Sequence, residues 1–241
     1  MLMFDRTIYF DNVRPLFGGT LTQDQVDGQE AILARWELEP PSDDLRHLAY
    51  PLATTKHETA STMMPIEEYG KGEGMEYGKP DPETGQTYYG RGYVQLTWRD
   101  NYKRATTELG LPSEDDLEWH ASGALDPDIA AEVMFVGMKE GWFRKSSDGR
   151  PQTLSRYFND TTDDPFEARE IINGDKNTVP SWSHGVSIGN LIAGYHRDFH
   201  AALMMSSLIK PVPEPDRRMV TISIATPDDV DVEIIVNGER V

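Results

Sequence analysis

Residues 42–60, SDDLRHLAYPLATTKHETA, carry the pattern that decides the fold. The apolar side chains of this stretch recur three or four residues apart, which places them on one face of an α-helix: Leu45, Leu48, Ala49, Leu52 and Ala53. Ser42 is a suitable N-cap, and the following Asp43 and Asp44 suit a first helical turn. The spacing predicts a helix that ends near Ala60, with Glu58 roughly opposite the apolar stripe and facing water or a cleft.

Further helical patterns lie on both sides of this stretch. Thr22 and Gln25 have the spacing of a capping box, so a helix is predicted over residues 22–37. Asp-Pro pairs at 126–127 and 164–165 open two more helices, predicted to reach about residues 138 and 174. The longest is predicted from residue 188 until Pro211 stops it. These helices predict a mainly α main domain over residues 1–210.

Residues 211–241 have a different pattern. Pro211-Val-Pro-Glu-Pro resembles a stiff linker, after which apolar residues alternate with a period of two across a Pro-Asp-Asp turn. The alternation predicts a β-hairpin over residues 220–236. Because a lone hairpin is marginally stable in water, it is expected to pack on the main domain or to mediate self-association with a second chain.

Composition excludes several classes of partner. The chain has 241 residues and a net charge of −18, from 23 Lys and Arg against 41 Asp and Glu, which disfavours binding to nucleic acids and anionic membranes. The absence of cysteine excludes disulfides, thiolate catalysis and cysteine-ligated metals. No apolar run is long enough for a signal peptide or a membrane span. The protein is therefore expected to be synthesised in the cytoplasm without a signal peptide and not to insert into membranes.

Histidine spacing gives no convincing metal site. His57-Glu58 resembles the start of a zinc-protease motif, but Ser61 occupies the position where the second histidine is needed. His196 and His200 have helical ligand spacing but lack an evident third ligand. No metal and no other cofactor is expected.

Two segments indicate a carbohydrate site. Residues 65–87 form a loop longer than most connections, and such loops are commonly functional or disordered. The following run, Tyr88-Tyr-Gly-Arg-Gly-Tyr-Val-Gln-Leu-Thr97-Trp98 with Asn101-Tyr102, combines aromatic rings, which stack on sugars, with amides and hydroxyls, which bind them. Taken alone, the run equally fits a glycine-kinked turn that leads into a helix with core aromatics.

Together, His57-Glu58-Thr59 and the run from Tyr88 to Tyr102 resemble the glycoside hydrolases of family 19, which include chitinases and phage endolysins. The endolysin-like branch is the closer match, on Leu16-Phe-Gly-Gly, Val26-Asp-Gly, Met63-Met-Pro-Ile and Tyr77-Gly-Lys-Pro-Asp-Pro. The resemblance covers roughly residues 13–202. It implies a bilobal, lysozyme-like helical fold and single-step inverting hydrolysis.

The resemblance also implies a pair of catalytic carboxyl groups. Inverting hydrolysis needs one acid to protonate the leaving oxygen and a second carboxylate, about 6.5–9.5 Å away, to activate water. Glu58 matches the acid. Glu68 and Glu67 are the leading candidates for the base, with Glu68 preferred, while Glu73 or Glu76 would suit the longer spacing of plant chitinases. Thr97 matches the hydroxyl residue that holds the attacking water.

Other positions match substrate-binding residues of the family. Gln95 and Asn101 match amides that bind the sugar, and Asn173 matches an asparagine of a segment that lines the cleft. Tyr88 and His57 are further candidates. The plant disulfides are absent, and the late cleft-side arginine of the family has no counterpart near Leu191-Ile-Ala-Gly-Tyr.

The leading hypothesis is an endo-acting muramidase of phage or prophage origin. It would cut the β-1,4 bonds of peptidoglycan between N-acetylmuramic acid and N-acetylglucosamine, and would act at the bacterial cell wall after release or export. A chitinase acting on chitin oligomers is the first alternative, which the acidic charge favours slightly. The second is a non-catalytic module that binds cell walls or serves as a virion component.

Overall fold

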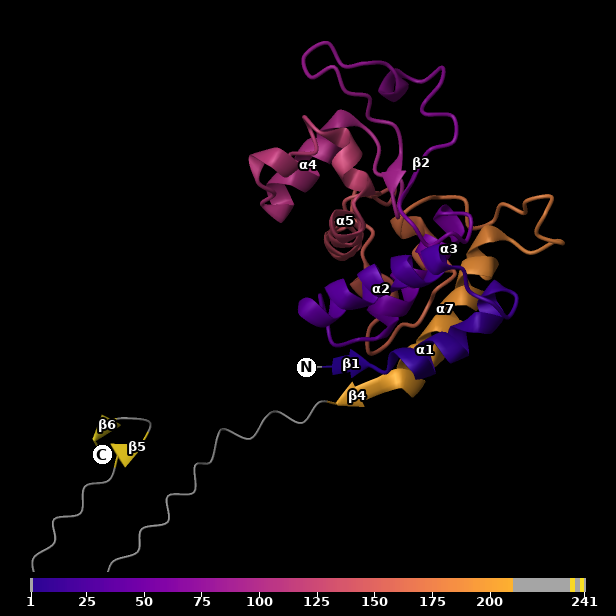
Figure 1. Ribbon diagram of the computed structural model, residues 1–241. Coiled ribbons are helices and arrows are strands. Elements are labelled where there is room, and N and C mark those ends of the chain that lie inside the picture. The colour runs from indigo at the N-terminus through magenta and orange to yellow at the C-terminus, as the bar shows by residue number, and fades with distance from the viewer. Residues whose placement is uncertain (1, 210–234, 237–238, 241) are drawn as a thin grey trace, which may run out of the picture. The chain divides into compact units, whose positions relative to one another are not determined.

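The computed structural model describes residues 2–209, 235–236 and 239–240, and its main unit is built largely from helices (Figure 1). The α-helices are α1 (Arg6–Val13), α2 (Gln23–Leu38), α3 (Arg46–Glu58), α4 (Arg99–Leu109), α5 (Pro127–Glu140), α6 (Leu154–Tyr157) and α7 (Ile188–Ser206). Short 3-10 helices lie between them: η1 (Arg14–Phe17), η2 (Glu76–Gly78), η3 (Ser113–Asp115), η4 (Ala121–Leu125) and η5 (Glu167–Ile171). The predicted mainly α fold is confirmed.

Two small antiparallel pairs of strands complete the main unit. β1 (Leu2–Phe4) pairs with β4 (Ser207–Ile209), so the first residues of the described chain lie beside those that follow α7. β2 (Ile66–Glu67) pairs with β3 (Arg91–Gly92), with Glu67 opposite Arg91. The second pair closes the long loop 65–87 at its base, which places the two predicted carbohydrate segments next to each other.

The contacts within the chain divide it into one unit of residues 1–210 and another of residues 211–241. Most of the predicted hairpin lies outside the described residues. What is described of the second unit is a short antiparallel pair, β5 (Ile235–Val236) with β6 (Glu239–Arg240). The hairpin over residues 220–236 and its role in self-association therefore stay predictions.

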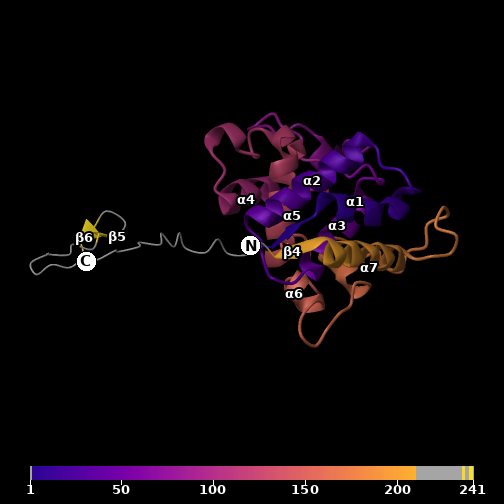
Figure 2. The ribbon, with the colours of Figure 1, turned by 60° about the horizontal axis from the view of Figure 1, so that its bottom comes forward.

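Buried side chains form two hydrophobic clusters, which correspond to the two lobes predicted. The larger contains Trp36 of α2, Leu48 of α3 and Phe199 of α7. The smaller contains Tyr102 of α4. Helix α5 contributes to both clusters, because Met134 belongs to the larger and Val133 to the smaller. Helix α7 packs along α3 and α1, as the second view shows (Figure 2).

Local sequence explains where several helices begin. Thr22 and Gln25 form the predicted capping box of α2, with the Thr22 Oγ1 accepting from the Gln25 amide at 3.2 Å. Asp126 caps α5 immediately before Pro127, and Ser187 caps α7. Helix α7 ends at Ser206, before the predicted stop at Pro211, because residues 207–209 pair with β1 instead.

Two helix predictions need correction. Helix α3 begins at Arg46 rather than after Ser42, because the Ser42 hydroxyl bonds the His47 ring at 2.8 Å instead of capping the helix. The helix predicted over residues 164–174 is only the short 3-10 helix η5. A longer helix there would compete with the turn that brings Asp175 back to Arg169, whose side chain also binds the distant Glu58.

A close approach between α2 and the segment after α3 requires glycine at position 28. A Cβ added to Gly28 would lie 1.8 Å from the Met63 carbonyl oxygen, whereas one added to Gly194, also within a helix, would meet nothing nearer than 3.9 Å.

Gly28→Ala is therefore expected to lower the free energy of unfolding by about 3 kcal/mol, because the backbone around Met63 must move. Gly194→Ala should raise it by about 0.5–1 kcal/mol, since alanine favours helix more than glycine does. Urea denaturation of both variants checks the contrast, and equal effects of the two substitutions would contradict it.

None of the helices in the described part of the chain is both long and apolar enough to cross a bilayer. The same part of the chain holds no cluster of three or more His, Cys, Asp or Glu side chains arranged to bind a metal ion.

Candidate active site

Glu58 is the last residue of α3 and is followed by a strained turn. Ala60, Ser61 and Met63 have positive φ values of 49°, 67° and 62°, which residues other than glycine rarely adopt. The buried Thr59 stabilises this turn, because its hydroxyl donates to the Thr55 carbonyl at 2.7 Å and accepts from the Met63 amide at 3.0 Å. Backbone strain of this kind persists only where the surroundings enforce it, and it is common at functional sites.

An arginine from η5 holds the carboxyl group of Glu58. The Arg169 side chain is 2% exposed, and its Nη1 lies 2.5 Å from Oε1 of Glu58, whose own side chain is 16% exposed. Arg169 also binds Asp175, with its Nε 2.7 Å from Oδ1. No group in the described residues donates a hydrogen bond to Oε2 of Glu58. One oxygen of the carboxyl is thus fixed and the other remains available to a ligand.

The pKa values in this cluster follow from burial and pairing. Burial alone would lower the pKa of Arg169, but the hydrogen bond to Asp175 and the charges of Glu58 and Asp175 raise it above its ordinary value. Burial would raise the pKa of Asp175, but the hydrogen bond from Arg169 and its charge lower it. The guanidinium and the Asp175 carboxylate are therefore both charged at neutral pH, and each stabilises the other.

Arg169→Met should lower the free energy of unfolding by about 3–5 kcal/mol, because the variant leaves carboxylates without their buried partner. Arg150→Met is a matched control: Arg150 also pairs with a carboxylate, that of Asp148, but its side chain is 70% exposed. Its effect should stay below about 1 kcal/mol. Chemical denaturation at pH 7 measures both, and a small effect at Arg169 would contradict a stabilising role.

His57 lies beside an exposed tryptophan. Its ring centroid is 6.4 Å from that of Trp182, which is 59% exposed and belongs to the segment before α7. Burial lowers the pKa of His57, so the ring is neutral at pH 7. An aromatic surface next to a carboxyl group is a common arrangement in sugar sites, because the apolar face of a pyranose stacks on the ring.

Lys56, two residues before the candidate acid, is buried and has no carboxylate partner among the residues that the structure describes. Its ammonium lies 4.4 Å from the Phe17 ring centroid and 4.8 Å from that of Tyr195, and it donates to the Ser61 hydroxyl at 2.8 Å. Burial lowers the pKa of Lys56 to about 8 from its ordinary value of 10.5. The side chain thereby ties the strained turn to η1 and α7.

Between about pH 8 and 10.5 the unfolded chain keeps a proton at Lys56 that the folded protein has released. The contribution of this group to stability therefore rises with pH across that window. The wild type is expected to gain about 1–3 kcal/mol relative to Lys56→Met between pH 7 and pH 10.5. Urea denaturation of both proteins at the two pH values measures the difference, and parallel curves would contradict the prediction.

Glu67, one of the two leading candidates for the base, is held tightly. Its carboxylate lies 2.7 Å from the Lys71 ammonium, 2.5 Å from the Tyr89 hydroxyl and 3.7 Å from Nε of Arg91. The hydrogen bonds from Lys71 and Tyr89 lower the pKa of Glu67. These donors keep the group ionised but occupy the oxygens that a general base must offer to water.

Glu68 is less constrained. Its backbone amide donates to the Gly90 carbonyl at 2.7 Å. Its carboxylate accepts from the Gly90 amide at 3.2 Å and from the Tyr77 hydroxyl at 3.5 Å, the second being a long and weak hydrogen bond. Successive residues of a strand point to opposite sides, so Glu67 and Glu68 face different surroundings.

Gln95, Thr97 and Asn101 form a chain of hydrogen bonds beside β2 and β3. The Gln95 amide donates to the Ile66 carbonyl at 3.2 Å, the Thr97 hydroxyl donates to the Gln95 carbonyl at 2.8 Å, and the Asn101 amide donates to the Thr97 carbonyl at 2.7 Å. Gln95 adopts a positive φ of 56° to do so. All three side chains are partly exposed and lie near the strand that carries Glu67.

The remaining predicted site residues have different surroundings. Tyr88 is 3% exposed, and its hydroxyl bonds Thr84 and the Glu118 carbonyl at 2.6 Å each, so it supports the fold rather than presenting a hydroxyl to a sugar. Asn173 is exposed and donates to Asp175 at 3.2 Å. It thereby joins the group around Glu58.

The predicted residues therefore fall into two groups. One contains Glu58, His57 and Asn173, and the other contains Glu67, Glu68, Gln95, Thr97 and Asn101. No hydrogen bond or ion pair among the described residues links the groups. Inverting hydrolysis requires an acid and a base that do not contact each other, since a sugar and a water molecule must fit between them.

Arg169, Asp175 and Trp182 contribute to the site but were not predicted from the sequence. No local signal marked Arg169, because Glu167 and Glu170 flank it in the sequence, as in a charged and solvated segment. Its partner could not be identified, because Glu58 lies 111 residues earlier.

Comparison with known proteins agrees with this architecture. No family model matches the chain. An endochitinase of Arabidopsis thaliana is 33% identical over 118 residues, which are 48% of this chain and 38% of that protein, so the chain spans well under half of this curated relative. Chitinase C of Streptomyces griseus superposes with a TM-score of 0.52 at 18% identity, over 84% of this chain and 77% of that chain. A bacterial family 19 chitinase superposes with a TM-score of 0.51 at 19% identity, over 83% and 94%.

The helices and the two hydrophobic clusters define a mainly α, bilobal class of fold. Within that class, the chain has the fold of the family 19 chitinases, and the resemblance identified in the sequence is confirmed.

Proposed function

We propose that the protein is an inverting, endo-acting glycoside hydrolase that cuts β-1,4 bonds between N-acetylated amino sugars. The arrangement of Glu58 carries the proposal. Its Oε1 is fixed by the buried Arg169, its Oε2 is free of partners among the described residues, and its side chain remains partly exposed at the end of α3. This arrangement presents a single carboxyl oxygen to a ligand in a defined orientation, which a general acid requires.

In the proposed reaction Glu58 is protonated on Oε2 and gives that proton to the glycosidic oxygen as its bond to the anomeric carbon breaks. A water molecule attacks the opposite face of the anomeric carbon and transfers a proton to the base. The products are a sugar with inverted configuration and a shortened chain with a new hydroxyl. Glu58 ends ionised, beside the Arg169 cation, which stabilises the carboxylate that remains.

We assign the base to Glu68. Among the described residues its carboxylate accepts one hydrogen bond of 3.2 Å and one long, weak hydrogen bond of 3.5 Å, so it retains capacity to accept a proton from water. The Glu67 carboxylate, in contrast, accepts shorter hydrogen bonds, at 2.7 Å from Lys71 and 2.5 Å from Tyr89. The hydroxyl of Thr97 donates to Gln95, which leaves the Thr97 oxygen free to accept a hydrogen bond from the attacking water.

For the polymer itself we propose peptidoglycan, cut between N-acetylmuramic acid and N-acetylglucosamine at the bacterial cell wall after release from the producing cell. The endolysin-like motifs of the sequence support this choice. Chitin is a second candidate, favoured by the chitinase relatives and by the net charge of −18, which disfavours anionic wall polymers.

Incubation of the protein with purified peptidoglycan and with chitin oligosaccharides, followed by mass spectrometry, tests the proposal. Fragments with muramic acid at the new reducing end would support the muramidase, whereas cleavage of chitin alone would establish the second candidate. Proton NMR during the first minutes identifies the anomer released. The α-anomer is expected from inversion of a β-linkage, and the β-anomer, or cleavage of neither polymer, would contradict the mechanism.

A further inference from the structure

One cavity in the described part of the chain is lined by neither Glu58 nor Glu68. This cavity, of about 310 Å³, opens between the loop around η2 and the first turn of α4. Its lining includes three aromatic side chains, Tyr77, Tyr88 and Trp98, and four charged ones, Glu76, Lys79, Asp81 and Arg99. Its volume is in the range of small-ligand sites in proteins.

Tyr77 and Trp98 form an aromatic corner in this cavity. Their ring centroids are 5.0 Å apart and their planes meet at 81°, so two ring surfaces stand at right angles. Trp98 is 51% exposed, although an indole of that size normally gains by burial. The corner offers one flat face for stacking and one edge for lateral contact.

The backbone at Trp98 is strained in a way that keeps the indole outside. Its φ is 75° and its ψ is 136°, a combination that is costly for a bulky residue. Its amide donates to the Tyr88 carbonyl at 2.8 Å, and its carbonyl accepts from the Asn101 amide at 3.0 Å. Both bonds hold Trp98 between β3 and α4 in this conformation, which is expected where a side chain is presented to a ligand.

The cavity is also fixed before any ligand binds. Arg99 lies 3.2 Å from Asp81, 2.7 Å from Glu83 and 2.6 Å from Glu118, which ties the loop to α4. A Cβ added at Gly78 would lie 2.0 Å from the Gly72 carbonyl oxygen, so the two strands of the loop are in direct backbone contact.

The charges that line the cavity are paired within the protein. Lys79 lies 2.6 Å from Glu76, and Arg99 is occupied by its carboxylates. A charged ligand would have to displace these partners, whereas a neutral ligand with hydroxyl and amide groups can use them as hydrogen-bonding groups. Aromatic faces together with paired polar groups fit a sugar.

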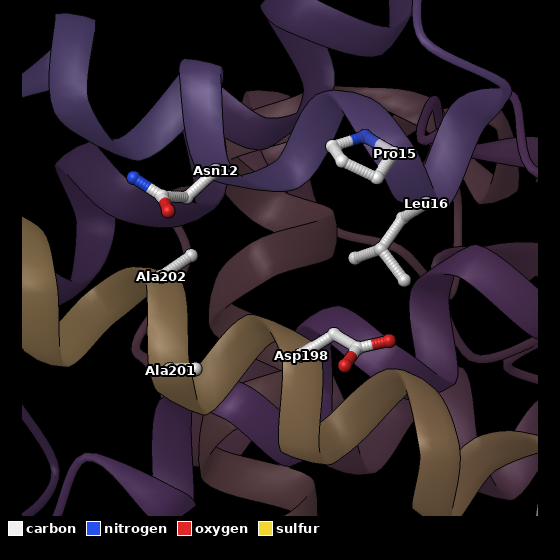
Figure 3. A pocket seen from close by; sticks show the side chains of 6 residues that line it. All are labelled: Asn12, Pro15, Leu16, Asp198, Ala201 and Ala202. Carbon is white, nitrogen blue, oxygen red and sulfur yellow. The ribbon is translucent and has the colours of Figure 1, made fainter.

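Another cavity, of about 300 Å³, has no such features. It lies between η1 and α7 and is lined by Asn12, Pro15, Leu16, Asp198, Ala201 and Ala202, with no aromatic side chain (Figure 3).

We propose that the Tyr77–Trp98 corner is a subsite that binds one N-acetylhexosamine unit of the polymer on the side of the site that carries Glu68. The Tyr77 hydroxyl is 3.5 Å from Oε1 of Glu68, so the corner adjoins the assigned base. The choice of a sugar rests on the proposed function, but binding at the corner can be measured without any hydrolysis. The pyranose face stacks on Trp98, and Tyr77 limits its position from the side.

The test uses the full chain with Glu58→Gln, which prevents turnover, and isothermal calorimetry with the hexamer of N-acetylglucosamine as probe. Adding Trp98→Ala should weaken hexamer binding about tenfold, whereas adding Trp98→Phe, which retains a flat ring, should weaken it less than threefold. Met75→Ala is the matched control, because Met75 is 48% exposed in the same loop but does not line the cavity. It should leave the Kd unchanged.

Each outcome decides one point. Equal hexamer affinity with and without Trp98→Ala overturns the subsite, as does failure of the Glu58→Gln protein to bind the hexamer at all. Binding that depends on Trp98, in a wild-type protein that hydrolyses neither polymer, supports the subsite and contradicts the proposed function. If Trp98→Ala also lowers thermal stability, Trp98→Phe distinguishes a folding defect from a lost contact with the sugar. Trp98→Phe must then restore hexamer binding as well as stability.

Discussion

Glu58→Gln is expected to lower turnover on amino-sugar oligomers by about 10²–10⁴-fold, the contribution typical of general acid catalysis. Glutamine has nearly the shape of glutamate, and its amide oxygen can still accept a hydrogen bond from Arg169. The contact that orients this side chain is therefore retained in the variant. What the variant lacks is a proton to give to the leaving oxygen. Rate measurements on a defined oligomer with fixed length check the expected loss.

Glu140→Gln provides a control of the same type. Glu140 is also the last residue of an α-helix, α5, but it is exposed and has no role in the proposed site. Its turnover should equal that of the wild type, and both variants should keep the circular dichroism spectrum of the wild type. Turnover of Glu58→Gln within a few-fold of the wild type would remove Glu58 from the role of acid.

Glu68→Gln is expected to lower turnover by about 10²-fold or more, because an amide cannot accept the proton that the attacking water must lose. Glu67→Gln should change turnover by only a few-fold. The Glu67 carboxylate is already bonded to Lys71 and Tyr89, and its contribution is to fix β2 against β3. Both variants carry the same substitution, at neighbouring positions, so they differ only in which carboxylate is lost.

Oligomer hydrolysis at several pH values measures both variants. Loss of the acidic limb of the rate profile in Glu68→Gln would support its role as base, since that limb reports ionisation of the base. The reverse ranking of the two variants would assign the base to Glu67. If both retain wild-type turnover, the base is Glu73 or Glu76, the two further acids of the loop.

The sequence predicted the helices whose start signals are local. The Thr22 capping box, Asp126 before Pro127 and the apolar spacing after Ser187 correspond to α2, α5 and α7. It predicted the start of α3 and the length of η5 wrongly, because both depend on distant partners. His47, whose ring binds Ser42, also contacts the Phe158 carbonyl, and Arg169 bonds Glu58 across 111 residues.

The candidate site could be predicted only in part for the same reason. Helical spacing located Glu58 away from the apolar stripe, and motif resemblance located Glu67, Glu68 and the run after Tyr88. Neither could show that Tyr88 is buried, because its hydroxyl partners, Thr84 and Glu118, are brought to it by the folded loop. Nor could they show that Trp98 is exposed, because the position of its indole depends on a positive backbone φ.

The pairing of β1 with β4 has a topological consequence. Leu2 lies opposite Ile209 and Phe4 opposite Ser207, so residues 2–209 form a nearly closed ring. A short peptide that joins residue 209 to residue 2 would complete the ring, and the exposed turn at Asp148–Gly149 is a suitable place to open it. In such a circular permutant the segments 149–209 and 2–63, which both contribute to the larger cluster, would be synthesised one directly after the other and before the residues of the smaller cluster.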